Sequence, residues 1–256
     1  MIDIYKKSLT EIQLMRESGK LLAEVFHELD NFVKAGVSTM EINDHFEHYI
    51  INKLKARPAS KGQYGYKYVL NSSINEVVCH GIPSATRKVK NGDILNIDIT
   101  LEKGGFITDS SKMYCIGKVS PVAKHLVDVT YKAMWQGISV VRPGARLGDI
   151  GHVIQTYAEQ HGFSIVREYC GHGIGREMHE EPQILHFGTP NTGAILDEGM
   201  TFTIEPMVNQ GTHKVKVKKD KWTVVTRDKK LSAQWEHTIL VTQDGFEVLT
   251  LRNEEK

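Results

Sequence analysis

The chain has 256 residues, 40% of them hydrophobic, which is enough to form the core of one large domain. A formal net charge of +1 excludes the strongly basic balance of proteins that bind nucleic acid through bulk electrostatics. The three cysteines are odd in number, and the sequence has neither an N-terminal signal segment nor a run of about 20 apolar residues. We therefore expect a cytoplasmic protein that makes no membrane contact and recognises no specific nucleic-acid sequence.

Amphipathic helices are predicted in both halves of the chain. Apolar residues recur at helical spacing from 14 to 29 and again from 126 to 138. A serine followed three residues later by a glutamate is the capping-box signature of a helix start. This signature occurs at Ser8 with Glu11 and at Ser38 with Glu41. We therefore expect a helix to begin after each of these serines.

The two halves share an order of features, which suggests an internal duplication. Residues 33–42 and 141–150 both read as a glycine turn that leads into a helix. Residues 92–98 and 199–205 both run from a glycine turn through a β-forming stretch to an acid. Chance similarity is the alternative, since such turns recur in all globular proteins. The common order makes duplication the preferred interpretation.

Carboxylates stand where strands normally place apolar residues. Asp98, Glu205 and Glu236 each lie among β-forming residues, and acids are almost never buried unless they are paired or bind a metal. Any one of them alone is more simply a salt-bridged or solvent-facing strand residue. Together with Asp109 and His172 they predict a metal site. Four converging anions need cations, and two divalent ions would balance them.

The ligand types indicate which chemistry this site supports. An oxygen-rich set with one imidazole suits manganese, iron, cobalt or zinc. Two such ions about 3.5–4 Å apart share bridging carboxylates and generate a nucleophile near neutral pH. The sequence therefore predicts a dinuclear metal hydrolase that acts on amides or phosphoesters.

Two further histidines are candidates for catalysis because glycines lie close to them. His80 lies within residues 77–83 and His179 within residues 175–182. An isolated histidine is more often structural, but an imidazole near a scissile bond stabilises an oxyanion or protonates a leaving amine. We therefore expect both histidines to be catalytic groups.

Three segments carry a resemblance to a known family. They are 73–83 (SINEVVCHGIP), 171–175 (GHGIG) and 231–238 (LSAQWEHT). With them the chain resembles the type I methionine aminopeptidases of the bacterial kind along essentially its whole length. The resemblance implies the α+β pita-bread fold of metallopeptidase family M24, in which helices cover a curved antiparallel sheet built from two pseudo-symmetric halves. It implies one catalytic domain over 1–256, with a pseudo-repeat at roughly 8–117 and 118–250.

The resemblance also assigns two divalent metal ions to the acidic cluster. It implies that Asp98, Asp109 and Glu236 bind one ion. The same resemblance assigns Asp109, His172, Glu205 and Glu236 to the other ion, so that Asp109 and Glu236 bridge the pair. Glu205 would act in addition as the general base or proton shuttle. The metal in the cell would be cobalt, manganese, iron or zinc.

Substrate-binding roles follow from the same resemblance. His179 would steady the scissile carbonyl, and His80 would lie near the amide nitrogen of the leaving peptide. Tyr66 and Trp222 match aromatic residues of the family's methionine pocket. At other pocket positions the chain departs from well-known bacterial members, so the size limits of the pocket are not implied. These positions are Ser60, Gln63, Asn71 and Met178.

The implied activity is the removal of the initiator methionine from nascent proteins whose second residue is small. An Xaa-Pro aminopeptidase or dipeptidase is one alternative, since it shares much of the metal set. A non-catalytic binding module with the same fold is another. The presence of all five ligands and both histidines favours the first activity.

One basic segment bears on the partners of the protein. Residues 214–221 alternate lysine with valine at the start, which is typical of a hairpin with one solvated face. The sharper interpretation is docking to the ribosome near the tunnel exit, where nascent N-termini emerge. We expect the chain to work there as a monomer.

Overall fold

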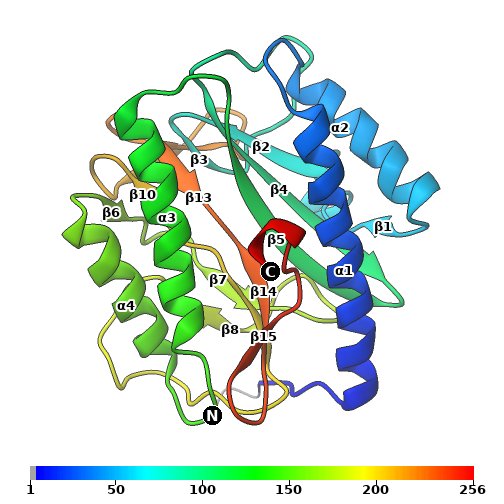
Figure 1. Ribbon diagram of the computed structural model, residues 1–256, viewed down its shortest axis with the longest axis vertical. Helices are drawn as coiled ribbons and strands as arrows, with labels where there is room; N and C mark the ends of the chain where they lie inside the picture. The colour runs from blue at the N-terminus through cyan, green and yellow to red at the C-terminus, as the bar shows by residue number, and fades with distance from the viewer. Residues whose placement is uncertain (1–3) are drawn as a thin grey trace.

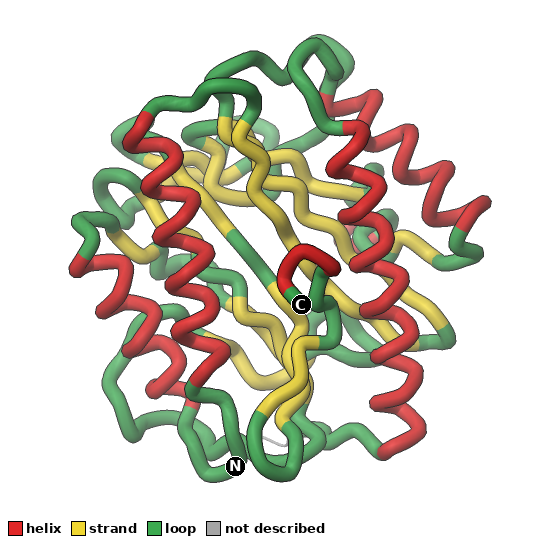
Figure 2. The backbone as a smooth tube through the Cα atoms, viewed as in Figure 1, coloured by secondary structure: helices red, strands yellow, loops and turns green. Residues whose placement is uncertain are grey.

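The computed structural model describes residues 4–256, and its helices flank a layer of strands (Figure 1). The long helices are α1 (Leu9–Phe32), α2 (Thr39–His48), α3 (Pro121–Ser139) and α4 (Leu147–Gln160). Short helical turns are η1 (Tyr49–Lys53), η2 (Gln63–Gly65) and η3 (Asn253–Glu255). Figure 2 shows α1 and α2 on one side of the molecule and α3 and α4 on the other, with the strands between and behind them.

The paired strands are antiparallel throughout the described residues. They are β1 (Arg57–Pro58), β2 (Leu70–Ile74), β3 (Val77–Cys79), β4 (Ile94–Lys103), β5 (Phe106–Cys115), β6 (Ser164–Ile165), β7 (Gly171–Gly173), β8 (Glu180–Ile184), β9 (Thr201–Ile204), β10 (Met207–Asn209), β11 (Val215–Val217), β12 (Val224–Thr226), β13 (Ser232–Gln234), β14 (His237–Val241) and β15 (Phe246–Val248). Within residues 4–256 the hydrogen bonds divide them into four sheets. The orders are β1-β4-β2 with β5 on β4, β13-β10-β6, β11-β12-β3 and β15-β14-β9-β7-β8.

One main-chain contact joins strands from the two halves of the chain. Ser111 on β5 and Glu236, between β13 and β14, exchange hydrogen bonds with N···O distances of 3.4 and 3.2 Å. The hairpin of the first half therefore lies against the last strands of the second half. This junction is the place where acids from both halves meet.

The predicted helix starts are confirmed. At the start of α1 the Ser8 hydroxyl accepts from the Glu11 amide, and the Glu11 carboxylate accepts from the Ser8 amide. Ser38 and Glu41 form the same reciprocal pair at the start of α2. Each box satisfies two amide groups that the helix itself leaves without partners.

Each pair of helices packs on its own apolar core. The first core joins α1 and α2 to β2 and β4, and it includes Leu22, Phe26, Ile42, Phe46, Leu70 and Ile97. The second joins α3 and α4 to β9 and β14, and it includes Leu126, Met134, Ile150, Ile154, Phe202 and Ile239. All of these side chains have an exposed fraction of 0%. The strands that carry the acids are therefore fixed from the helical side.

The basic segment forms the predicted hairpin, in which β11 pairs with β12. Its two valines differ in burial, since Val215 packs against a small apolar cluster whereas Val217 is 52% exposed. The reason is that β11 is the edge strand of its sheet. No helix within residues 4–256 is both long and apolar enough to cross a membrane.

Candidate metal centre and substrate cavity

The five predicted ligands come from different strands and meet in one cavity. Asp98 lies on β4, Asp109 on β5 and His172 on β7, whereas Glu205 directly follows β9 and Glu236 lies between β13 and β14. All five line a cavity of about 520 Å³. This volume falls in the range of small-molecule sites, which is about 300–1,000 Å³.

Strand register explains why Asp98 and Asp109 face the same space. On the β4–β5 hairpin Asp98 is opposite Ser111, and Asp109 is opposite Thr100. The two acids are therefore diagonal neighbours on one face of the hairpin, within reach of each other. The pairing of Ser111 with Glu236 brings the acid of the second half to the same place.

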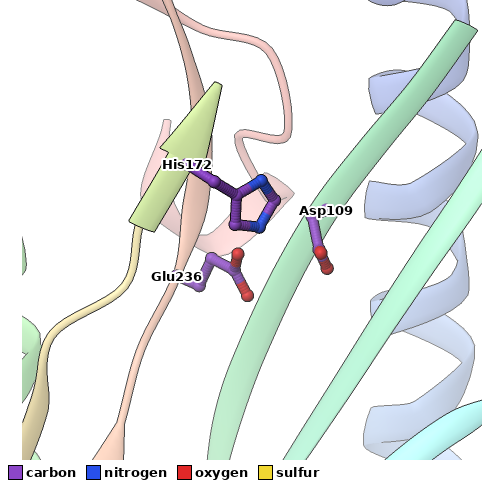
Figure 3. Close-up of side chains that lie close together, drawn as sticks. All are labelled: Asp109, His172 and Glu236. Atoms are coloured by element: carbon purple, nitrogen blue, oxygen red, sulfur yellow. The ribbon is translucent and has the colours of Figure 1, made fainter. Parts of the chain in front are cut away.

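Three of the ligands come together most closely (Figure 3). One ligand atom each from Asp109, His172 and Glu236 lies within 4.8 Å of the others. Figure 3 shows the imidazole and the two carboxylates pointing toward a common centre. Asp98 and Glu205 belong to the same buried cluster, because each perturbs the titration of the neighbouring acids.

Burial raises the pKa values of all four acids. It raises the pKa of Asp98 to about 6 and that of Glu205 to about 8. Burial, and then the neighbouring carboxylates, hold the pKa values of Asp109 and Glu236 well above their ordinary range. Desolvation and mutual repulsion disfavour the charged forms. A divalent cation at the centre would remove this penalty, because it supplies the missing opposite charge.

The orientation of His172 suits a metal ligand. Its Nδ1 lies 3.0 Å from the carbonyl oxygen of Gly173, which can only accept a hydrogen bond. The ring proton therefore belongs on Nδ1, and the lone pair of Nε2 faces the acids. Oδ1 of Asp109 is buried with no hydrogen-bond partner. A free imidazole lone pair and an unpaired carboxylate oxygen both fit a bound divalent ion.

Residues around Glu205 fix its carboxylate, and sequence reasoning missed their role. Thr203 Oγ1 donates to Oε1 over 2.7 Å, and Gln234 Nε2 donates to Oε2 over 3.2 Å. The Glu205 amide donates to Nε2 of His186, which is fully buried. Strand alternation could have indicated Thr203 and Gln234. Each lies two residues before an acid, and residues at this spacing lie on the same face of a strand. The sequence contains no comparable signal for His186.

A second set of polar residues supports the acids of the first half. Asn71 Nδ2 donates to Asp98 Oδ2 over 3.1 Å. Thr100 Oγ1 donates to Asp109 Oδ2 over 3.2 Å, and Ser60 Oγ in turn donates to Thr100. Ser60 and Asn71 are two of the departures from the family pattern, and in this chain they are hydrogen-bonded to the ligand network.

The predicted aromatic pocket residues stack on each other at the wall of the cavity. The rings of Tyr66 and Trp222 are 5.0 Å apart with an interplanar angle of 10°. The Tyr66 hydroxyl donates to the carbonyl of Leu70 over 2.8 Å, which fixes the ring. Gln63 and Met178 line the same cavity. The result is a flat apolar wall beside the acids.

Both candidate catalytic histidines line this cavity. The His179 ring lies 4.4 Å from the His172 ring, and the His80 ring lies 5.8 Å from that of Trp222. Burial lowers the pKa of His80 to about 4 and also lowers the pKa of His179. Both imidazoles are therefore neutral near pH 7, and each has one N–H to donate.

All three cysteines are free thiols. Cys79 is buried, whereas Cys115 and Cys170 are only partly buried. Cys79 and Cys170 line the cavity, a position that nothing in the sequence indicated. Burial raises the pKa values of both thiols, which makes neither a ready nucleophile.

Comparison with known proteins identifies the relatives of this chain. The model of a family described as Metallopeptidase family M24 matches residues 13–243. The methionine aminopeptidase of Escherichia coli is 49% identical over 249 residues, which cover 97% of this chain and 94% of the relative. The crystal structure of methionine aminopeptidase from Rickettsia prowazekii has a TM-score of 0.95 at 50% identity, with 97% of this chain and 100% of that chain covered.

A more distant structure shares the fold alone. The prolidase from Pyrococcus horikoshii OT3 has a TM-score of 0.76 at 20% identity, and the alignment covers 97% of this chain and 64% of that one. Together these structures confirm the α+β pita-bread fold that the sequence predicted.

Proposed function

This chain belongs to metallopeptidase family M24 and is of the methionine aminopeptidase kind, and we propose that it removes the initiator methionine from nascent proteins whose second residue is small. The observation that carries the proposal is the convergence of five metal-ligand side chains and two neutral histidines in one cavity with a stacked aromatic wall. Similarity over nearly the whole chain supports the same activity.

We propose that two divalent ions bind at the acidic cluster. Asp98, Asp109 and Glu236 would hold one ion, and Asp109, His172, Glu205 and Glu236 would hold the other. Manganese, iron, cobalt and zinc all suit this set of oxygens and one nitrogen. When bound, such a pair supplies a nucleophile at neutral pH and polarises the scissile carbonyl.

Glu205 is proposed to move the proton of the attacking water. Its carboxylate is held at both oxygens, by Thr203 and by Gln234, so a proton is accepted and returned at a fixed position. Burial raises the pKa of Glu205 to about 8 when no ion is bound, and a divalent ion beside it would favour the charged form that accepts a proton.

The two histidines are proposed to act on the substrate from opposite ends of the scissile amide. His179 would donate its N–H to the carbonyl oxygen, where negative charge develops. His80 would lie beside the nitrogen that leaves. Since burial keeps both imidazoles neutral, each offers one donor and one acceptor and adds no positive charge to the site.

Tyr66 and Trp222 are proposed to bind the methionine side chain. A thioether is flexible and polarisable, and it makes favourable contacts with aromatic rings. The stacked pair presents such rings at the cavity wall. Specificity for a small second residue would require a narrow space beyond His80 and His179.

The test is hydrolysis of Met-Ala-Ser, Leu-Ala-Ser and Met-Leu-Ser by metal-stripped protein titrated anaerobically with Mn²⁺, Fe²⁺, Co²⁺ and Zn²⁺. The proposal predicts cleavage of Met-Ala-Ser alone, and only after an ion is added. Preference for an Xaa-Pro peptide would indicate an Xaa-Pro aminopeptidase instead. No cleavage with any ion would indicate a non-catalytic binding module.

We further propose that the chain docks on the ribosome through its basic hairpin. Lys216, Lys218, Lys219 and Lys229 line one surface groove of about 610 Å³. All four are exposed, and within residues 4–256 none of them forms an ion pair. Free lysines grouped in this way suit contact with ribosomal RNA phosphates, which would be salt-dependent and indifferent to base sequence.

Cosedimentation with ribosomes tests the docking proposal. The double variant Lys216→Glu/Lys218→Glu is expected to lose binding at low salt. The control is Lys20→Glu/Lys132→Glu, which makes the same charge change at exposed positions on α1 and α3. Equal binding by both variants would contradict docking through the hairpin.

We also propose that the whole chain acts as one catalytic domain with a pseudo-repeat at roughly 8–117 and 118–250, as a monomer in the cytoplasm. The two helix pairs, each with its own core, support the repeat. Unpaired cysteines support a reducing compartment. Sedimentation equilibrium tests the monomer, and a dimer mass would contradict it.

A further inference from the structure

Arg252, close to the C-terminus, is a charged side chain in the interior of the protein. It is 1% exposed and is among the largest fully buried side chains. Arginine is almost never buried unless its charge is paired and its donors are used. The partners of its guanidinium group should therefore explain why Arg252 is buried.

The guanidinium group is bonded on both of its sides. Nη1 donates to Ser110 Oγ over 3.0 Å and to the carbonyl oxygen of Ser111 over 3.3 Å. On the other side Glu255 forms the ion pair, with 3.1 Å between Nε and Oε2, and accepts a hydrogen bond from Nη2 over 3.2 Å. Nη2 also lies 3.1 Å from Nε2 of His237.

Aromatic rings hold the same group in place. The guanidinium carbon lies 5.3 Å from the centre of the Phe26 ring and 5.4 Å from that of Trp235. Phe26 belongs to α1, and Trp235 lies between β13 and β14. Arg252 therefore connects the first helix to the last strands of the second half.

The residues that Arg252 binds are the ones that join the two bridging acids. Ser110 Oγ donates to the carbonyl oxygen of Glu236 over 2.7 Å. Ser111 and Glu236 exchange two main-chain hydrogen bonds. Asp109 precedes Ser110 in the chain, so one network sets the spacing between the Asp109 and Glu236 backbones.

Arg252 acts from the side opposite the cavity. Successive side chains of a strand point to opposite faces, so Ser110 points away from the face that carries Asp109. In Figure 1 the C-terminal turn η3 lies between α1 and α3, on the helical side of the strands. Arg252 therefore touches neither the cavity nor a candidate ligand side chain.

We propose that Arg252 is a positioning residue for the metal centre. By binding Ser110 and Ser111 it fixes the separation of Asp109 and Glu236, and so it sets the affinity of the site for divalent ions. The inference rests on the proposed function, in which these two acids bridge the ions. Arg252 would thus contribute to metal binding although it does not line the cavity.

The test is Mn²⁺ binding to purified protein, followed by isothermal titration calorimetry. Arg252→Met keeps the apolar stem and removes every hydrogen bond of the guanidinium group. Loss of groups that orient ligands weakens metal affinity about 10–100-fold, and because Arg252 acts one residue further away we expect about tenfold. Arg252→Lys keeps the charge but lacks the planar guanidinium group with its several fixed donors. We therefore expect an affinity for Mn²⁺ between those of the wild type and Arg252→Met.

A matched control separates positioning from general stability. Leu29→Ala removes a fully buried side chain from the α1 core but leaves Ser110, Ser111 and Glu236 untouched. It is expected to lower the melting temperature and keep the wild-type affinity for Mn²⁺. If Arg252→Met does not fold, Ser110→Ala removes the hydroxyl that accepts from Arg252 and donates to Glu236, and its affinity for Mn²⁺ is expected to fall by about threefold.

The outcomes distinguish the inference from the proposed function. Wild-type protein that binds no Mn²⁺ would overturn the proposed function itself. Wild-type affinity in folded Arg252→Met, or in Ser110→Ala when that variant replaces it, would overturn the inference alone. Equal loss of affinity in Leu29→Ala would also overturn it, because the effect would then follow stability and not position.

Discussion

His172 and Glu205 face each other with 3.5 Å between Nε2 and Oε1, yet they do not form an ion pair. Burial lowers the pKa of His172 to about 3 and raises that of Glu205 to about 8. Both groups are therefore neutral near pH 7. A divalent ion binds a neutral imidazole directly, whereas the Glu205 carboxyl group must first lose its proton, so metal binding at this site would release a proton.

Metal binding is expected to stabilise the fold. Ions that bind only the folded state raise the free energy of unfolding by about 2.7 kcal/mol at one hundred times Kd. Urea unfolding with and without Mn²⁺ measures this change. Asp109→Asn is the control, since it removes a shared ligand and should remove the added stability. An unchanged unfolding midpoint, with Mn²⁺ shown to be bound, would contradict the convergence of the acids on the ion.

Replacing the proposed proton carrier should stop turnover while leaving the cavity intact. Glu205→Gln keeps the size and one carbonyl oxygen of the side chain but cannot accept the proton. We expect kcat for Met-Ala-Ser to fall by about 10²- to 10⁴-fold. Glu198→Gln, at an exposed position, makes the same chemical change and should leave kcat unchanged. Near-normal turnover in Glu205→Gln would refute the assigned role.

The role of His179 leads to a separate kinetic prediction. If its N–H stabilises developing charge on the carbonyl oxygen, His179→Ala should lower kcat by about 10²- to 10³-fold and change KM less. His125→Ala, on the exposed side of α3, is the matched control. A rise in KM with kcat preserved would show that His179 binds the ground state and the transition state equally and does not stabilise the developing charge.

The cap of α1 predicts a pH dependence of stability. The Ser8 amide, then the Tyr5 hydroxyl and Arg176, lower the pKa of Glu11 from 4.5 to about 2. Since the folded-state value is depressed, the added stability is complete above pH 4.5 and is lost as the pH falls toward 2.

Urea unfolding between pH 5 and pH 3 measures the effect of this cap. Glu11→Gln should be less stable than wild type at the upper pH, and the difference should shrink as the pH falls. Glu17→Gln, exposed on the same helix, should show neither change. A difference that stays constant with pH would mean that the Glu11 charge does not stabilise the cap.

Much of the fold follows from local signals in the sequence. The capping boxes at Ser8 and Ser38 satisfy amide groups next to them, so both helix starts could be predicted without tertiary information. Asp98 and Glu205 were identified because an acid among β-forming residues conflicts with burial. Such conflicts are expected where function overrides local preference.

Other parts of the site depend on tertiary contacts and carry no local signal. His186 accepts from the Glu205 amide from the bend that follows β8, and nothing in its neighbouring residues distinguishes it from a core histidine. Arg252 reads as an ordinary surface arginine near the chain end. Val217 was expected on a covered face, but whether a face is covered depends on neighbours that the hairpin sequence does not specify.

Anomalous diffraction from crystals grown with Mn²⁺ tests the two-ion centre itself. Two peaks about 3.5–4 Å apart are expected in the cavity, one against Asp98 and the other against His172, with Asp109 and Glu236 between them. A single peak that leaves Asp98 unbound would contradict the two-ion centre. Peaks only outside the cavity would contradict the metal centre as a whole.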